Sequence, residues 1–174
     1  MLSILPELAE LKGRIVGEFV CVMTPSASQM IHPSLVGAVL GTRVYAHSSD
    51  YLGGGAAHKD LVKNVDAVLI APATVNTLAQ LAGGMTNNLL TLAVANFSGP
   101  IGLVPSVNSV MAAKKSTQRV LAQLASEGYI LAEEERNAAV DLLGTVQTGS
   151  SKFGLRRLLL KLADGKVVEI AEGN

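Results

Sequence analysis

The sequence is poor in cysteine, aromatic residues and charge, and each shortage excludes a class of protein. Its 174 residues include one cysteine, Cys21, so no disulfide can form within the chain and a zinc site built from cysteines is not expected. Aromatic residues make up 3% of the chain and tryptophan is absent, which argues against stacking platforms for bases or sugars. The 14 Lys and Arg residues balance the 14 Asp and Glu residues, so the chain has no general attraction for nucleic acid or an anionic membrane.

Two further absences concern location. Residues 1–10 contain Pro6, Glu7 and Glu10 and no basic start, unlike a secretory signal. The longest apolar runs are broken well short of the length that spans a membrane. We therefore predict a cytoplasmic protein that binds neither membrane nor nucleic acid.

A large apolar fraction is present instead. Apolar residues make up 49% of the chain and charged residues 16%, whereas disordered chains are poor in hydrophobic residues and rich in net charge. The length suits one domain, over residues 1–174, that can bury a sizeable core without disulfides or a structural metal. So apolar and neutral a chain also predicts surface that is hidden in an oligomer.

Helical and strand-like patterns alternate along the chain. The leucines at positions 5, 8 and 11 mark one face of a helix over 3–12. Strand patterns cover 14–23, 42–46, 66–71, 101–104 and 129–132, and helical patterns cover 24–41, 58–64, 77–81, 86–96 and 116–127. The apolar run DAVLIA at 66–71 is typical of a strand buried on both faces of a parallel sheet. The alternation predicts an α/β fold with a doubly wound parallel sheet.

Polar turns follow several strands, where doubly wound sheets bind their ligands; the first is 24–27. In the turn 72–77, side chains and free N–H groups could hold a polar ring edge or a ribityl chain. In the turn 105–111, Asn108 could donate to a carboxylate. The simpler interpretation is that the turns 72–77 and 105–111 only cap the helices that follow them. In 72–77 the N-cap would then be Asn76 or Thr77.

A further candidate is His58, which follows a glycine loop at a predicted helix start. A helix start disfavours imidazolium, so the ring would stay neutral and could act as a base. The alternative is an ordinary surface histidine. His32 and His47 have no comparable setting, and we interpret them as structural.

The ordered set of motifs is more specific than any one motif. The segment HKDLVKNVDAVLIAPATVNTLAQLAGGMTNNLL, followed by PSVNSVM, resembles the homo-oligomeric flavin-containing cysteine decarboxylases. That family includes phosphopantothenoylcysteine decarboxylase and the decarboxylases that act on the C-terminal cysteine of lanthipeptide precursors. The resemblance covers roughly residues 24–132. It implies a Rossmann-like fold and FMN bound at the subunit contacts of a trimer, which in some members assembles into a dodecamer.

The resemblance also implies roles for matching residues. His58 would be catalytic, and Asn108 would hold the substrate carboxylate. The residues that would lie near the FMN or line it are Thr24, Ser26, Ala73, Thr74, Val75, Asn76 and Ser106. Besides Asn108, the substrate side would contain Met111, Thr148 and Lys152, and no metal site is expected. The core would cover about 14–132, a flexible flap about 133–154, and a C-terminal helix and tail 155–174.

The implied chemistry solves a problem of cysteine itself, which has no electron sink for the carbanion left by loss of CO2. Transfer of a hydride from Cβ to the flavin, with the thiol deprotonated, gives a thioaldehyde. Its C=S group accepts the electron pair when CO2 leaves, and the product is an enethiol. His58 would take the thiol proton or assist that step, and Asn108 would align the carboxylate with the developing π system.

Several departures from the family bear on the substrate. The family's first strand and its Gly/Ser phosphate-binding turn are absent. Single-residue departures are Val107 for Met, Ala112 for a frequent Trp, and Asn87 for the usual Asp. Phosphopantothenoylcysteine decarboxylase carries a cysteine in a late glycine-rich flap that helps reduce the enethiol. The corresponding stretch, 146–154, has no cysteine.

The missing flap cysteine favours the peptide branch, in which the enethiol is the product and goes on to an aminovinyl-cysteine ring. Lys152, Arg156 and Arg157 could contact such a peptide or simply form a solvated helix start. Two alternatives stay open: phosphopantothenoylcysteine decarboxylase itself, and a non-catalytic flavin-binding regulatory subunit.

Overall fold

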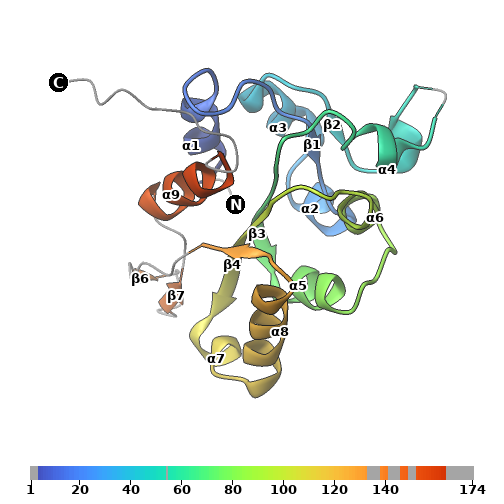
Figure 1. Cartoon of the computed structure of the whole chain (residues 1–174). Helices are drawn as coiled ribbons and strands as arrows, with labels where there is room; N and C mark the ends of the chain where they lie inside the picture. Colours follow the sequence, from blue (N-terminus) through green and yellow to red (C-terminus); the bar gives the residue numbers. More distant parts are fainter. Residues whose placement is uncertain (1–3, 54, 133–137, 141–145, 149–151, 164–174) are drawn as a thin grey trace.

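The protein alternates helices and strands along most of its length. The structure, a computed structural model, describes residues 4–53, 55–132, 138–140, 146–148 and 152–163. Its elements are α1 (Ile4–Leu11), β1 (Cys21–Val22), α2 (Pro25–Met30), α3 (Pro33–Leu40), β2 (Val44–Tyr45), η1 (Ser48–Asp50), α4 (Ala57–Asp60), β3 (Val68–Thr74), α5 (Val75–Ala82), α6 (Leu89–Ala95), β4 (Ile101–Asn108), α7 (Ser109–Ala112), α8 (Lys115–Ser126), β5 (Ile130–Leu131), β6 (Ala138–Val140), β7 (Val146–Thr148) and α9 (Lys152–Ala163). Figure 1 shows their arrangement.

Strand β4 is the centre of the main sheet. Its first half pairs in parallel with β3 and with β5, and its end pairs in antiparallel fashion with β7, to which β6 adds. β1 and β2 form a separate parallel pair, and within the described part of the chain they share no hydrogen bond with the main sheet. The predicted α/β class with parallel strands is confirmed. The antiparallel β6–β7 hairpin is an addition that the sequence patterns did not indicate.

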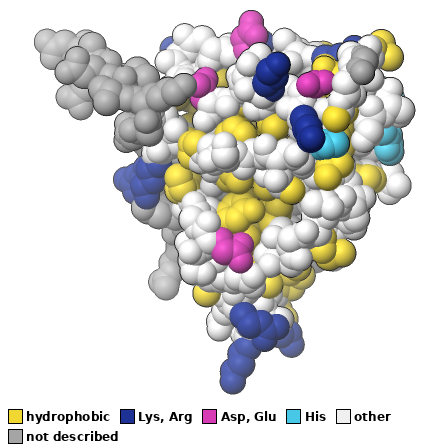
Figure 2. Space-filling model, turned by 45° about the vertical axis from the view of Figure 1, so that its right-hand side comes forward, with side chains coloured by type: hydrophobic (Ala, Val, Ile, Leu, Met, Phe, Trp, Pro, Cys, Tyr) yellow, Lys and Arg dark blue, Asp and Glu magenta, His cyan; other side chains and the backbone are white. Residues whose placement is uncertain are grey.

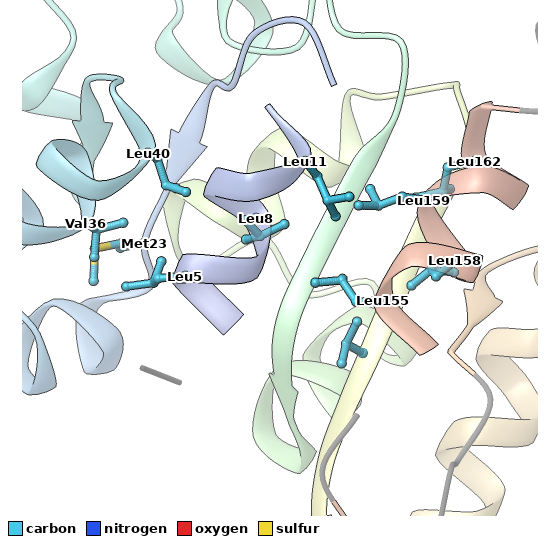
Figure 3. Close-up of a cluster of buried hydrophobic side chains, with 11 residues drawn as sticks. Leu5, Leu8, Leu11, Met23, Val36, Leu40, Leu155, Leu158, Leu159 and Leu162 are labelled. Carbon is cyan, nitrogen blue, oxygen red and sulfur yellow. The ribbon is translucent and has the colours of Figure 1, made fainter. Parts of the chain in front are cut away.

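Two helical layers cover the sheet. On one face the cluster of buried side chains includes leucines of α1 and α9, which point toward one another in Figure 3. The predicted face at Leu5, Leu8 and Leu11 is therefore confirmed, because all three are buried there. On the other face, leucines of α5 and α8 pack against β3 and β4. Gly102 of β4 permits the close approach of α9, since a Cβ there would lie 2.8 Å from Leu162 Cδ1.

The first strand is much shorter than the sequence predicts. The pattern at 14–23 predicts ten residues of strand, but only Cys21 and Val22 form one. Gly13 adopts a φ of +78°, which ends the preceding helix with a turn, and Gly17 follows in the same segment. Glycine weakens extended structure because it has no side chain to pack. The apolar content of this segment therefore does not extend the strand.

The two central strands run further than their apolar patterns. β3 continues through Pro72 to Thr74, and β4 continues through Pro105 to Asn108. Proline removes a backbone donor, so each of these stretches had been interpreted as a turn. Strand β3 accommodates the proline with a register shift between Ile70 and Ala73 and a cis Ala71–Pro72 bond. Each predicted polar turn is thus the end of a strand plus the start of a helix.

Candidate functional site

Three parallel strands end in the same local design. β3 and β4 each end on a polar residue that caps the next helix, Thr74 for α5 and Asn108 for α7. Thr24, which caps α2, follows β1 after one residue. The ψ angles of the three caps lie between 156° and 162°, and each side chain accepts a hydrogen bond from a backbone N–H three residues on. Such caps satisfy N–H groups that a helix start would otherwise leave free.

The ends of β3 and β4 bring the two predicted motifs side by side. Ala73 lies opposite Pro105, and Thr74 lies opposite Ser106. Ala73 is completely buried in the core, whereas Thr74 and Ser106 are exposed. The structure therefore brings together these three of the residues expected to contact the cofactor.

The start of α5 supplies hydrogen-bond donors next to the ends of β3 and β4. The Thr77 N–H donates to Thr74 Oγ1 at 3.4 Å, so the cap is Thr74, and the predicted cap at Asn76 or Thr77 is wrong by two or three residues. The error arises because β3 extends through the proline. Asn76 lies in the first turn with an exposed side chain, and the N–H groups of Val75 and Asn76 have no partner inside the helix.

These donors match the acceptor-rich edge of a flavin. An isoalloxazine ring presents carbonyl oxygens and ring nitrogens along its pyrimidine edge, and helix-start N–H groups with a nearby carboxamide can donate to them. The exposed Ser106 hydroxyl lies opposite Thr74 at the same strand ends and adds a further polar group. The residues present therefore fit the group that the resemblance implies.

Asn108 combines a structural contact with a free donor. Its Oδ1 accepts the Met111 N–H at 2.8 Å, which starts α7. The oxygen is therefore engaged, and the Nδ2 amide group remains as two donors on a half-buried side chain. The helix-cap interpretation is therefore confirmed, and the donor role toward a carboxylate stays a prediction. Met111 is 41% exposed next to it.

The late hairpin lies beside Asn108. Thr148 of β7 pairs with Val107, and Gln147 pairs with Asn108. Thr148 therefore lies beside the end of β4, and its contact with substrate stays a prediction. Lys152 is the first residue of α9, and the residues between it and β7 lie outside the described residues. Much of the predicted flap, 133–154, likewise falls outside them. Gln147 was not singled out from the sequence, which offers no signal for the hairpin register.

The turn at Thr24 belongs to the separate β1–β2 pair. Thr24 is half-buried and its Oγ1 accepts the Ala27 N–H at 3.2 Å, while Ser26 is exposed in the first turn of α2. Ala27 packs against the same apolar cluster as Ala71 of β3. This turn and the β3 end are therefore linked through one core.

His58 lies on another part of the chain. It is half-buried in α4, which packs on α6 through Ala57, Leu61 and Leu89. Figure 1 shows α4 well away from α7 and from the end of β4. The helix predicted over 58–64 is shorter in the structure, where α4 covers Ala57–Asp60. One chain does not by itself bring His58 to the strand ends.

The single thiol is not part of this arrangement. Cys21 lies in β1, and burial raises its pKa to about 11. The thiolate is the nucleophilic form of cysteine, so this side chain is inert near neutral pH. Within the part of the chain that the structure describes, no three His, Cys, Asp or Glu side chains gather as metal ligands would. In that same part, no helix has the length and apolar character to cross a membrane.

The parallel strands with polar caps at their carboxyl ends are the arrangement of nucleotide-binding α/β proteins. This chain belongs to the Flavoprotein family, whose pattern matches residues 3–152. Among curated relatives, the coenzyme A biosynthesis bifunctional protein CoaBC of Vibrio cholerae is 39% identical over 114 residues, which is 63% of this chain and 28% of that protein. The Haemophilus influenzae protein of the same name is 33% identical over 126 residues, 72% of this chain and 32% of the relative. The chain thus spans about a third or less of these relatives.

Solved structures match nearly the whole chain. The FMN-dependent cysteine decarboxylase SpaF is 30% identical with a TM-score of 0.78, and the match covers 93% of this chain and 90% of SpaF. TvaF, an FMN-dependent cysteine decarboxylase from thioviridamide biosynthesis, is 33% identical with a TM-score of 0.67, over 76% of this chain and 84% of TvaF. The peptidyl-cysteine decarboxylase EpiD shares the fold at 21% identity, with a TM-score of 0.75.

Proposed function

We propose that this protein is an FMN-dependent decarboxylase that converts the C-terminal cysteine of a peptide into an enethiol. The observation that carries the proposal is the match to SpaF, an FMN-dependent cysteine decarboxylase, over nine tenths of both chains. The TvaF match at 33% identity supports the same activity. The sequence motifs retained at His58 and Asn108 support catalysis rather than flavin binding alone.

FMN would be held at the ends of β3 and β4. The N–H groups at the start of α5 and the Asn76 carboxamide would donate to the ring edge. Ser106, opposite Thr74 in the sheet, adds an exposed hydroxyl to the same site. When bound, FMN supplies the oxidation that gives the substrate an electron sink.

The substrate carboxylate would lie against the Asn108 amide. Because the oxygen of this carboxamide accepts the Met111 N–H, the two amide N–H donors would be the groups left for a substrate. A carboxylate is purely an acceptor and is the natural partner for them. The role of Asn108 is to orient the bond that breaks, and the role of His58 is to take the thiol proton.

The site would be completed by a second copy of the chain. His58 and the β4 end lie apart in one copy, so bringing the histidine to the cofactor requires a neighbouring subunit. Exposed apolar side chains occur around the site and elsewhere on the surface: Met30 (78%), Met85 (50%), Val110 (64%) and Met111 (41%). Figure 2 shows apolar side chains gathered over the middle of one face. A cytoplasmic homotrimer, alone or within a dodecamer, would cover such surface.

A peptide is favoured over a small thiol because the chain has no second thiol. In phosphopantothenoylcysteine decarboxylase a flap cysteine helps to reduce the enethiol to the saturated thiol, and residues 146–154 of this chain contain no cysteine. Its one cysteine, Cys21, is half-buried in β1 with a pKa raised to about 11. The enethiol would therefore be released as the product.

The decisive experiment compares two substrates. Purified protein with FMN is incubated with a peptide that ends in cysteine and, separately, with phosphopantothenoylcysteine. We expect the peptide to lose CO2 plus two hydrogens by mass spectrometry. An unchanged peptide mass, with flavin absorbance confirming bound FMN, would overturn the proposal.

Phosphopantothenoylcysteine decarboxylase is the second candidate, and one observation favours it. The curated relatives, which reach 39% identity over 114 residues, are CoaBC proteins of coenzyme A biosynthesis. In that case the small substrate, and not the peptide, would be consumed, and the saturated thiol would accumulate.

A further inference from the structure

Between residues 67 and 126, the charged residues are confined to one short segment. From Ala67 to Ser126 the sequence carries no Asp or Glu, and its only Lys and Arg residues are Lys114, Lys115 and Arg119. That stretch contains both strand-end turns and the helices that follow them. We call these three residues the 114–119 cluster. Within residues 67–126 the 114–119 cluster is therefore the only charged segment, and its charge is positive.

The 114–119 cluster lies directly beside the substrate end of the site. Asn108 caps α7, and the Lys114 N–H donates to the Met111 carbonyl at 3.1 Å, so one short helix separates the cluster from Asn108. All three cationic residues are exposed. Figure 2 shows Lys and Arg side chains gathered at the end of the molecule where Figure 1 places α7 and the start of α8. No ion pair is found for these side chains within the described residues.

Local structure does not account for these cations. Lys114 is the N-cap of α8 and makes no side-chain capping bond, and Lys115 is the first residue of the helix. A helix start carries partial positive charge and is stabilised by Asp or Glu, whereas lysine there is unfavourable. The first turn of α8 contains no acidic residue. The cluster therefore costs the helix some stability, which is consistent with a role outside the fold.

We infer that the 114–119 cluster binds acidic side chains of the peptide substrate upstream of its C-terminal cysteine. This inference rests on the proposed function and names the class of peptide. With the terminal carboxylate at Asn108, the preceding residues of the peptide would extend over α7 toward α8. Exposed Val110 and Met111 line that path and would contact the apolar parts of the peptide.

The shape of the cluster favours a peptide over a single phosphate. Lys115 and Arg119 lie one helical turn apart on the same face, with Cβ atoms about 6 Å apart. In an extended peptide, side chains two residues apart point the same way and lie roughly 7 Å apart. The two spacings match, so alternate acidic residues could contact successive cations. A phosphate group would instead need several donors converging on one point.

The experiment compares matched peptides and matched variants of the full protein with FMN. One peptide carries two Glu residues at alternate positions before the terminal Cys, and its partner carries Gln at the same positions. We expect kcat/KM for the Glu peptide to exceed that for the Gln peptide by about three- to tenfold, through KM. The preference should vanish near 0.5 M salt, where the screening length falls to about 4 Å.

The Lys115→Glu variant should abolish or reverse this preference. The matched control is Arg14→Glu, an equal charge change at an exposed residue in the segment after α1, which should retain the preference. Equal kcat/KM for the two peptides, or a preference that survives Lys115→Glu, would overturn the inference alone. If kcat/KM for phosphopantothenoylcysteine exceeded that for both peptides, the inference would be overturned, and the cluster would be assigned to a phosphate instead. Failure to decarboxylate any cysteine peptide would instead refute the proposed function.

Discussion

Asn108 offers a test that separates the helix cap from the substrate contact, because one side chain performs both tasks with different atoms. Its oxygen accepts the Met111 N–H, and its amide N–H groups would donate to the substrate carboxylate. Asn108→Asp keeps an acceptor at the cap and removes the donors. Asn108→Ala removes both. The two substitutions should therefore rank oppositely in stability and in activity.

The magnitudes follow from the two contacts. Aspartate caps helices about as well as asparagine, so Asn108→Asp should unfold within about 0.5 kcal/mol of the natural protein. Asn108→Ala should lose about 1 kcal/mol, or roughly 2–4 °C in Tm for a domain of this size. A hydrogen bond to a charged carboxylate contributes about 1.5–3 kcal/mol, so Asn108→Ala should lose roughly ten- to hundredfold in kcat/KM. Asn108→Asp should lose more, because two carboxylates would then repel.

The assay is decarboxylation of a cysteine peptide together with thermal unfolding, with flavin absorbance checked in each variant. Asn88→Asp is the matched control, since Asn88 caps α6 by accepting the Thr91 N–H at 3.0 Å and has no assigned role in the site. It should retain activity. If Asn108→Asp were as active as the natural protein, or more active than Asn108→Ala, the carboxylate contact would be wrong. If Asn108→Ala were as stable as Asn108→Asp, the cap would be wrong.

Three further predictions address catalysis, the thiol and the core. His58→Gln should lower kcat by about a hundredfold or more while flavin absorbance is retained, and His32→Gln should leave kcat nearly unchanged; full activity of the first variant would remove the histidine from the mechanism. Because burial raises the pKa of Cys21 to about 11, the fold favours the protonated thiol. Its contribution, at most about 3 kcal/mol, is present below the ordinary thiol range near pH 9 and is lost as pH rises toward 11. Urea unfolding at pH 8 and pH 11 should therefore show a fall in stability that Cys21→Ser reduces, and an identical fall in both proteins would contradict this account. Leu103 is fully buried in β4, so Leu103→Ala should lower the free energy of unfolding by about 2–5 kcal/mol, measured as a lower urea midpoint. A loss under about 1 kcal/mol would mean that the centre of the sheet is misassigned.

The sequence patterns located most of the fold because burial imposes regular spacing on apolar residues. The leucine face of α1 and the apolar runs of β3 and β4 follow directly from packing against a core. The polar residues at 72–77 and 105–111 were recognisable for a related reason. Strand ends in parallel sheets carry the ligand-binding groups, and the order of these motifs along the chain was specific.

Local patterns failed where a residue's usual preference was overridden. Pro72 and Pro105 indicate turns in a sequence, yet pairing between β3 and β4 carries both strands past them. The cap of α5 therefore moved to Thr74. In the other direction, glycines at 13 and 17 shortened a strand that the apolar content predicted.

The amino-acid sequence by itself determined the α/β class, the two strand-end motifs and the lack of a second thiol, since each depends on residue type and local spacing. Only the tertiary structure decided that Thr74 and Ser106 are neighbours, that β7 lies along Asn108, and that α4 lies apart from both. Pairing between distant strands sets these positions, and strand register depends on contacts that are far apart in the chain.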